Sequence, residues 1–508
     1  MALNDIKFNK GQGGLGRPLA GQDYVSGIIF YTQDGNLPSG FTTTDRIKEV
    51  FSIADAENLG ILNDYSDASA AHATITINGA GSTGDTVKLV ANEPLGKVVT
   101  IGTYTRPSTD TTEDLVATGV AAMINAGTYS HGYSASASTD TVTITFPKKL
   151  GSYPNTGTPL TVTAIGISVS AVSLGGDGYH SRLAIWHYHI SEYFRIQPKG
   201  DLYISMQPYP NTYDFAEITS LQNHANGRIR QVAVYVKWVN FNTGHIQAIH
   251  DQIVTNCDAN HMPLSALYAG KMTNISDLTT LDNLNTLNAN KCSAVISQDG
   301  AGQGAFLALT SNQSITTLGA CLGAVSFASV SDDIAWIGKF NISNGVECDT
   351  LAFANGTAVN SLSKGTLDLL DNYRYIFLVK YVGISGSYFN DSHTAIIETS
   401  DYAYIENNRV IDKAIRGIYS SVLPALNSPL VLNADGTLTD ETVAYFTGLA
   451  ELNLTQMIRD VELSAEKVTI DPTQDVLGTN TLVIAVQLLP IGVARNITVN
   501  IAFTTKIA

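Results

Sequence analysis

The run QVAVYV, residues 231–236, points most directly to the fold of this 508-residue chain. It is rich in β-branched and aromatic residues and contains no Gly or Pro, as is typical of a buried strand. Helical sequence follows at 244–256 and 315–327, and further strand-like sequence at 293–296 and 375–379. Because strands that alternate with helices form βαβ units, we expect an α/β core over residues 176–400, with a mixed, largely parallel sheet flanked by helices.

Residues 69–175 differ from the rest of the chain in composition and in the spacing of their apolar residues. Short alternating runs of Thr, Val and Ile are separated by Gly, Ser, Asn and Asp, which predicts antiparallel strands. The strand-like runs lie at 73–78, 86–90, 98–101 and 141–146, and one helical stretch lies at 113–125. We therefore expect an inserted β-rich domain that faces outward from the core.

The C-terminal part of the chain predicts two helices and a terminal β-hairpin. The first helix, 404–423, ends at Pro424. Its apolar stripe consists of Ile405, Ile411, Ile415, Ile418 and Val422. The second helix runs to about residue 461, and two strands, 481–489 and 495–503, flank a Pro-Ile-Gly turn. The last strand places four apolar side chains on one face: Ile497, Val499, Ile501 and Phe503.

These patterns divide the chain into five expected parts, a multidomain α+β arrangement overall. They are an N-terminal arm (1–20), the first part of the core (21–68), the inserted domain (69–175), the α/β core (176–400) and a C-terminal helical and β subdomain (401–508) that ends in a linking strand (495–508). Within the first part of the core, a strand is expected at 24–31 and a short helix at about 44–51.

Composition excludes several classes of function. The net charge is −16 and no run of five Lys or Arg residues occurs, which argues against a protein that coats nucleic acid. Charged residues make up only 15% of the chain, which suits a surface that other subunits cover. No apolar stretch is long enough for a membrane span, and the N-terminus has no secretory signal pattern. The four cysteines form no C-x-x-C pair and are expected to be buried, reduced thiols.

Glycine motifs raise the alternative of a nucleotide-binding enzyme. The spacing G-x-G-x-x-G occurs at Gly11–Gly16 and Gly79–Gly84, and a looser form begins at Gly300. A dinucleotide site also needs a preceding strand, a following helix and an acidic residue about 20 positions later. The first motif precedes Arg17-Pro18 and the second joins two strands, while the loop at Gly300 has no acidic residue before position 330. We expect no cofactor.

Two further groups of residues suggest chemistry without completing a site. Read as a strand, WHYH at 186–189 places His187 and His189 on one face, but no further ligands complete a metal site. Asp391, Ser392 and His393 have the residue types of a hydrolase triad, but sequence neighbours cannot align as nucleophile, base and orienting acid. We therefore expect no catalytic residues, no bound metal and no enzyme activity.

Three stretches resemble contractile tail sheath proteins. They are RIKEVFSIADAENLG at 46–60, YIENNRVIDKAIR at 404–416, and the strand, Pro-Ile-Gly turn and strand at 482–503. The resemblance implies a structural subunit of a phage or phage-like tail. Such subunits polymerise as a sixfold helical or stacked-ring homo-oligomer around an inner tube, contact baseplate and terminator proteins, and contract to drive the tube through a cell envelope. Assembly in the bacterial cytoplasm and a place in the virion tail are implied too.

The resemblance also implies that both ends of the chain link neighbouring subunits. The expected linking residues are Leu3, Ile6 and Phe8 in the N-terminal arm and Ile497, Val499, Ile501 and Phe503 at the C-terminus. Gly11, Gly13, Gly14 and Gly16 are expected to act as a flexible hinge. A β-rich, receptor-binding tail protein remains the alternative that the 69–175 region supports.

Overall fold

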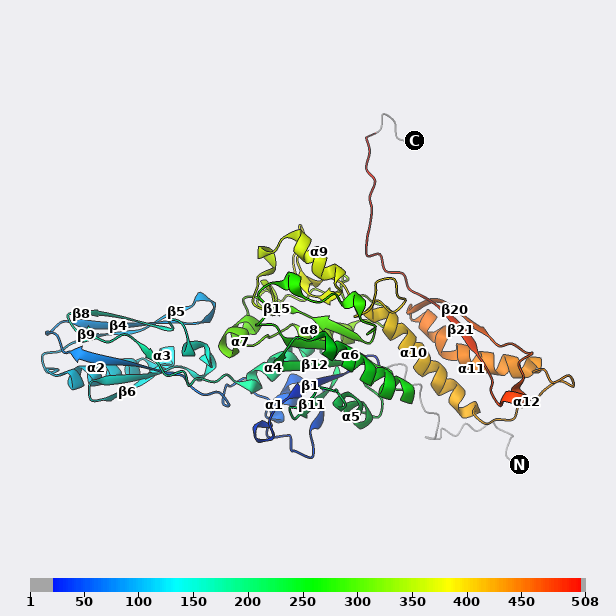
Figure 1. Ribbon diagram of the computed structural model, residues 1–508, viewed down its shortest axis with the longest axis horizontal. Coiled ribbons are helices and arrows are strands. Elements are labelled where there is room, and N and C mark those ends of the chain that lie inside the picture. The colour runs from blue at the N-terminus through cyan, green and yellow to red at the C-terminus, as the bar shows by residue number, and fades with distance from the viewer. Residues whose placement is uncertain (1–21, 504–508) are drawn as a thin grey trace, which may run out of the picture.

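A twisted sheet lies at the centre of the molecule, in the part of the chain that the computed structural model describes, residues 22–503 (Figure 1). Its strand order is β17 (Tyr375–Ile376), β14 (Cys292–Val295), β13 (Ser265–Lys271), β12 (Gln231–Asn240), β1 (Val25–Tyr31), β11 (Asp201–Gln207) and β2 (Ile47–Val50). All neighbours are parallel except β2, which is antiparallel to β11. The predicted α/β core with a mixed, largely parallel sheet is therefore confirmed.

Helices cover this sheet on both faces. The chain steps from β1 to β11 in one direction and from β11 to β12 and β13 in the other, so right-handed crossovers place the connecting helices on opposite faces. The helices are α4 (Arg182–Ile196) and α8 (Leu318–Phe327), which pack together, and α5 (Glu217–His224) and α6 (Thr243–Gln252). All four cysteines are free and buried, as expected.

Smaller elements complete the central region. They are α1 (Ile53–Asn58), α7 (Gln303–Ser311), α9 (Lys364–Asn372) and two antiparallel pairs, β15 (Ser297–Asp299) with β16 (Leu351–Phe353) and β18 (Leu378–Val379) with β19 (Tyr388–Phe389). No helix among the described residues is long and apolar enough to cross a membrane.

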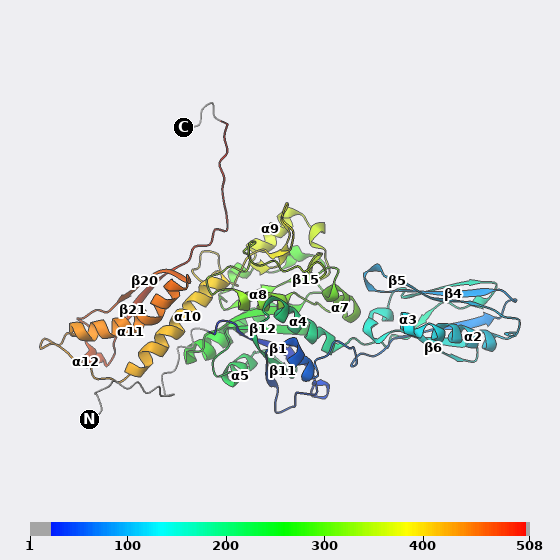
Figure 2. The same cartoon turned by 180° about the vertical axis from the view of Figure 1, so that it is seen from behind.

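Residues 72–174 form a separate β-rich region at one end of the elongated molecule (Figures 1 and 2). Its strands are β3 (His72–Gly79), β4 (Thr86–Asn92), β5 (Val98–Thr105), β6 (Ser134–Ser138), β7 (Thr141–Thr145), β8 (Leu160–Ile165), β9 (Ser168–Val169) and β10 (Ser173–Leu174). The helices are α2 (Glu113–Ala126) and α3 (Thr128–His131). The region has its own apolar cluster, to which Phe306 of α7 adds a partly buried ring.

The opposite end of the molecule contains two long helices and a small sheet. These elements are α10 (Ile405–Val422), α11 (Asp440–Arg459), α12 (Val476–Thr479) and the antiparallel strands β20 (Leu463–Thr469) and β21 (Ala485–Pro490). The helices pack against each other, and β20 lies on α11.

Ion pairs, not apolar side chains, dominate the buried face of α10. Lys413 contacts Asp23 at 2.7 Å and Glu462 at 2.6 Å, and Arg416 also contacts Asp23. Asp412 pairs with Lys291 at 2.6 Å, and both side chains are almost fully buried. The pairs with Asp23 and Lys291 connect the C-terminal part of the chain to the core beside β1 and β14.

The structure corrects three expectations. Residues 47–50 form strand β2 instead of a helix, and the helix begins later, at Ser52, whose side chain accepts a hydrogen bond from the Asp55 amide. WHYH at 186–189 belongs to helix α4, not to a strand. The terminal β-hairpin has different partners, because β21 pairs with β20, and residues 491–503 have no assigned strand.

Candidate functional site: the C-terminal segment and the groove beside β21

The C-terminal segment consists of residues 491–503, and its last part runs away from the body of the molecule in both views (Figures 1 and 2). The four apolar side chains predicted to share a face are all exposed: Ile497 by 80%, Val499 by 71%, Ile501 by 90% and Phe503 by 109%. An alternating apolar segment needs a partner sheet to become a stable strand. Within the described residues of this chain it has none.

The apolar stripe of α10 is also unpartnered over part of its length. Ile405 is buried, but Ile415 is 43% exposed, because the polar face of the helix carries the ion pairs to the core. The stripe lines a hollow of about 550 Å³ next to β21, called here the β21 groove. Its lining comprises apolar residues of α10 (Val410, Ile411, Ala414, Ile415 and Ile418) and of β21 (Val486, Leu488 and Pro490), with Asp401, Tyr402 and Asn407 at one part of it.

Val486 and Leu488, alternate residues on one face of β21, line the β21 groove. One edge of β21 pairs with β20, and no second strand pairs with its other edge in the part of the chain described. An unpaired edge above an apolar floor can accept an extended chain, with main-chain hydrogen bonds to the edge and alternate side chains on the floor. The groove and the C-terminal segment are therefore chemically complementary.

Arg495 fixes the start of the C-terminal segment to the body. Its Nε lies 3.0 Å from Asp391 Oδ1, its Nη2 lies 3.1 Å from Asp333 Oδ2, and the guanidinium also pairs with Glu406. Burial and the charges of Glu406 and Asp391 raise the pKa of Asp333 to about 7. Burial alone would lower the pKa of Arg495, but the three carboxylates raise it. The sequence analysis missed this cluster.

Two carboxylates of the chain itself already accept hydrogen bonds from the backbone amides of the loop at Gly300. The Gln303 and Gly304 amides, at the start of α7, donate to the carboxylate of Glu347. The Gly302 and Ala305 amides donate to Asp299 Oδ2 at 2.6 and 3.1 Å. A bound phosphate would use these same amides, so it would first have to displace both carboxylates.

The residues Asp391, Ser392 and His393 turn toward separate partners. Asp391 contacts Arg495, Ser392 Oγ donates to Glu406 Oε2 at 2.5 Å, and His393 lies 2.9 Å from Asp371. Nucleophile, base and orienting acid therefore do not align. His187 lies 2.9 Å from Glu57, whereas His189 is buried against aromatic rings and burial lowers its pKa to about 3.

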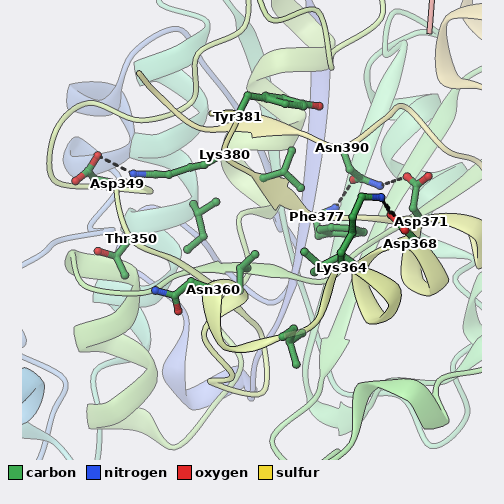
Figure 3. Close-up of a pocket in the computed structure, with 15 residues that line it drawn as sticks. Asp349, Thr350, Asn360, Lys364, Asp368, Asp371, Phe377, Lys380, Tyr381 and Asn390 are labelled. Atoms are coloured by element: carbon green, nitrogen blue, oxygen red, sulfur yellow. Dashed lines mark hydrogen bonds and ion pairs between the residues drawn. The ribbon is translucent and has the colours of Figure 1, made fainter. Parts of the chain in front are cut away.

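A hollow of about 790 Å³ lies beside α9 (Figure 3). Its rim pairs Lys364 with Asp368 and Lys380 with Asp349. Burial alone would raise the pKa of Asp371, but hydrogen bonds from His393 and Asn390 lower it. The charged groups are thus engaged with one another, and Figure 3 shows none converging on a common point in the hollow. Throughout residues 22–503, no three His, Cys, Asp or Glu side chains are arranged to hold a metal ion.

Seven of the predicted site residues lie outside the described residues. They are the arm residues Leu3, Ile6 and Phe8 and the hinge residues Gly11, Gly13, Gly14 and Gly16. Their roles stay predictions.

Comparison with known families places the chain in one of them. Residues 3–393 match the family described as DUF2586, N-terminal domain, and residues 401–508 match DUF2586, C-terminal domain. The first match alone spans more than half of the chain, so the chain belongs to the DUF2586 family. A comparison with curated proteins found no match.

The fold is similar to that of several solved sheath structures. The anti-feeding prophage (AFP) helical sheath in its contracted state has 14% identity and a TM-score of 0.43, over 63% of this chain and 81% of that chain. The PVC sheath complex of an extracellular contractile injection system, also contracted, has 13% identity and a TM-score of 0.41, over 63% and 80%. A sheath tail protein from Listeria innocua has 8% identity and a TM-score of 0.37, over 93% and 98%.

Proposed function

We propose that this chain is the non-enzymatic subunit of a contractile tail sheath and links to its neighbours by strand addition. The observation that carries the proposal is that one chain has both an exposed alternating segment, 497–503, and an unfilled groove beside β21, a strand with one unpaired edge. A subunit whose donor engages the acceptor of a neighbour assembles head to tail, as a ring if the rotation closes and as an open helical polymer if it does not. This is the arrangement that a helical sheath requires.

The remaining parts of the proposal extend from this linkage. The polymer surrounds an inner tail tube with sixfold symmetry, contacts baseplate and terminator proteins, and assembles in the bacterial cytoplasm before it becomes part of a tail. Contraction is a rearrangement between two packings of the same subunits, without nucleotide. The N-terminal arm and its glycine hinge reinforce the contact between subunits that the C-terminal link has joined.

The same proposal assigns the β-rich region at 69–175 to an inserted, outward-facing domain. It lies at the end of the molecule away from α10 and α11, where the links form (Figure 1). Its separate apolar cluster supports the division between this region and the core.

Two variants test the linkage when they are mixed. The first ends after Arg495, which removes the donor segment and leaves the β21 groove. The second carries Ile415→Asp, which places a charge on the floor of the groove and leaves the donor. We expect the full chain to form filaments in negative-stain electron microscopy and each variant alone to remain a folded monomer. An equimolar mixture should form a one-to-one complex in size-exclusion chromatography, because one donor meets one groove.

Ile165→Asp provides the matched control. Ile165 lies on β8 and is 67% exposed, so the same charge is introduced on a surface without a linking role. It should polymerise like the unaltered chain. Filaments from the truncated chain, or a mixture that stays monomeric, would refute linkage through this groove.

A further inference from the structure

The start of the C-terminal segment is held by contacts that differ from those of its tip. In addition to its three carboxylates, the Arg495 guanidinium lies 3.5 Å from the centre of the Tyr404 ring, and Nη2 lies 3.3 Å from Ser392 Oγ. Cation–π contact and charge-assisted hydrogen bonds are among the stronger interactions of an arginine. They converge on one side chain, directly before the exposed residues of the segment.

The partners of Arg495 come from three separate segments of the chain. Asp333 lies in the loop after α8, Asp391 follows β19, and Glu406 is in the first turn of α10. Their side chains are 7%, 14% and 3% exposed. Arg495 therefore connects the C-terminal segment both to the core and to the helix that carries the β21 groove.

The residues around Arg495 also lie along the surface of the core. Residues 491–495 and Ile497 line a hollow of about 630 Å³ together with Trp336 and Tyr381. Beyond this point, Val499, Ile501 and Phe503 are largely exposed. The segment thus has a held root, 491–495, and a free tip, 496–503.

We propose that Arg495 is a clasp that fixes the direction in which the tip leaves the body, so that only residues after it are available to a neighbour. The clasp itself is a property of the single chain, and only its use in setting the geometry of a link rests on the proposed sheath function. Arginine suits the position because its planar fork reaches several carboxylates at once, whereas lysine offers a single ammonium.

Spin-label distances in the full chain test the clasp directly. The labels are attached at Thr498→Cys, beyond Arg495, and at Lys364→Cys, on the exposed surface of α9, since the four native cysteines are buried. The chain also carries Ile415→Asp, so that no neighbour holds the tip. We expect a narrow distance distribution with Arg495 present. Arg495→Ala should broaden it by roughly 15 Å, the reach of about eight flexible residues after Pro490.

Two comparisons make the result specific. Arg495→Lys should give an intermediate width, because it keeps a charge but loses the fork. Arg459→Ala, at the exposed end of α11, should leave the distribution narrow. Equal widths with and without Arg495 would overturn the clasp.

The assembled state separates this proposal from the sheath proposal. If the unaltered chain forms no filaments, the sheath function fails, but the distances still decide whether the clasp exists. If it does, Arg495→Ala should still form filaments, because the tip is intact, but with reduced helical order in electron micrographs. Filaments with unchanged order would refute the role of the clasp in the link.

Discussion

Asp333 shows how a single buried carboxylate makes the Arg495 cluster sensitive to pH. Burial, together with the charges of Glu406 and Asp391, which share the same guanidinium, raises the pKa of Asp333 to about 7. In the unfolded chain the same carboxyl group ionises near pH 4. The folded state binds more protons between these values, so this group's contribution to stability is greatest at low pH and is lost as the pH rises toward 7.

Asp333→Ala should therefore remove a pH dependence from the thermal stability. The melting temperature of the unaltered chain relative to Asp333→Ala is expected to fall by a few degrees between about pH 5 and about pH 8, on the order of 1–2 kcal/mol. Glu398→Ala, on the exposed surface, is the control and should show no such trend. A difference in melting temperature that is the same at both pH values would contradict the prediction.

Arg495 also marks a limit of sequence reasoning. The sequence predicts the alternating apolar residues that follow it, because a period of two is visible locally. Its partners lie in three segments that are distant in sequence, and only the fold brings them together. No local pattern distinguishes this arginine from an exposed one.

Among the elements, several core strands and the longer helices were predicted close to their observed bounds. The core strands β12 and β14 and the helix α2 lie where composition and period place them. Helix α4 was missed because Trp and Tyr favour strands in isolation. Ser181 was the available signal, since its side chain caps α4 by accepting from the Ala184 amide.

Helix α10 shows a second limit. Its apolar stripe was predicted correctly, but the sequence does not show which face of the helix packs on the core. The buried face pairs Asp412 and Lys413 with charges of the core, and Ile415 is left to line the β21 groove. Burial of paired charges is rare enough that a sequence pattern favours the opposite orientation.

Close packing of α4 against α8 depends on a glycine. A Cβ on Gly319 would lie 2.1 Å from the carbonyl oxygen of His189, an approach that the two helix backbones cannot relieve without moving apart. Gly319→Ala should therefore lower the stability of the core by about 2–3 kcal/mol or more. The measurement is the melting temperature by circular dichroism.

Gly448→Ala is the matched control for this prediction. Gly448 lies in α11 and is exposed, and a methyl group added to it would meet no other atom within 4 Å. Alanine should stabilise the helix by about 1 kcal/mol, because it has the higher helix propensity. If both alanines shift the melting temperature in the same direction, packing at Gly319 is not the cause.

For the molecule as a whole, the β-rich region can be tested as an insertion. Ser69 and Tyr179 form an antiparallel bridge, in which the nitrogen of each lies 3.0 or 3.1 Å from the carbonyl oxygen of the other. The two connections to the region therefore lie side by side. The main apolar cluster of the core contains no residue from 69–175.

Replacing residues 70–178 with a short Gly-Ser linker should leave a folded core that still forms filaments. Phe306→Ser accompanies the deletion, since the ring would otherwise lose its cover. We expect a melting temperature within a few degrees of that of the full chain, by circular dichroism, and normal filaments by electron microscopy. An insoluble or unfolded product would show that the region is an integral part of the core.

The ion pairs between α10 and the core have a consequence for reversible movement. When an apolar joint opens, it exposes surface that adheres to other molecules. When Lys413 and Arg416 separate from Asp23, the exposed groups regain hydration instead. Such a joint closes in one position, where the charges match, and its charged groups are hydrated again when it opens.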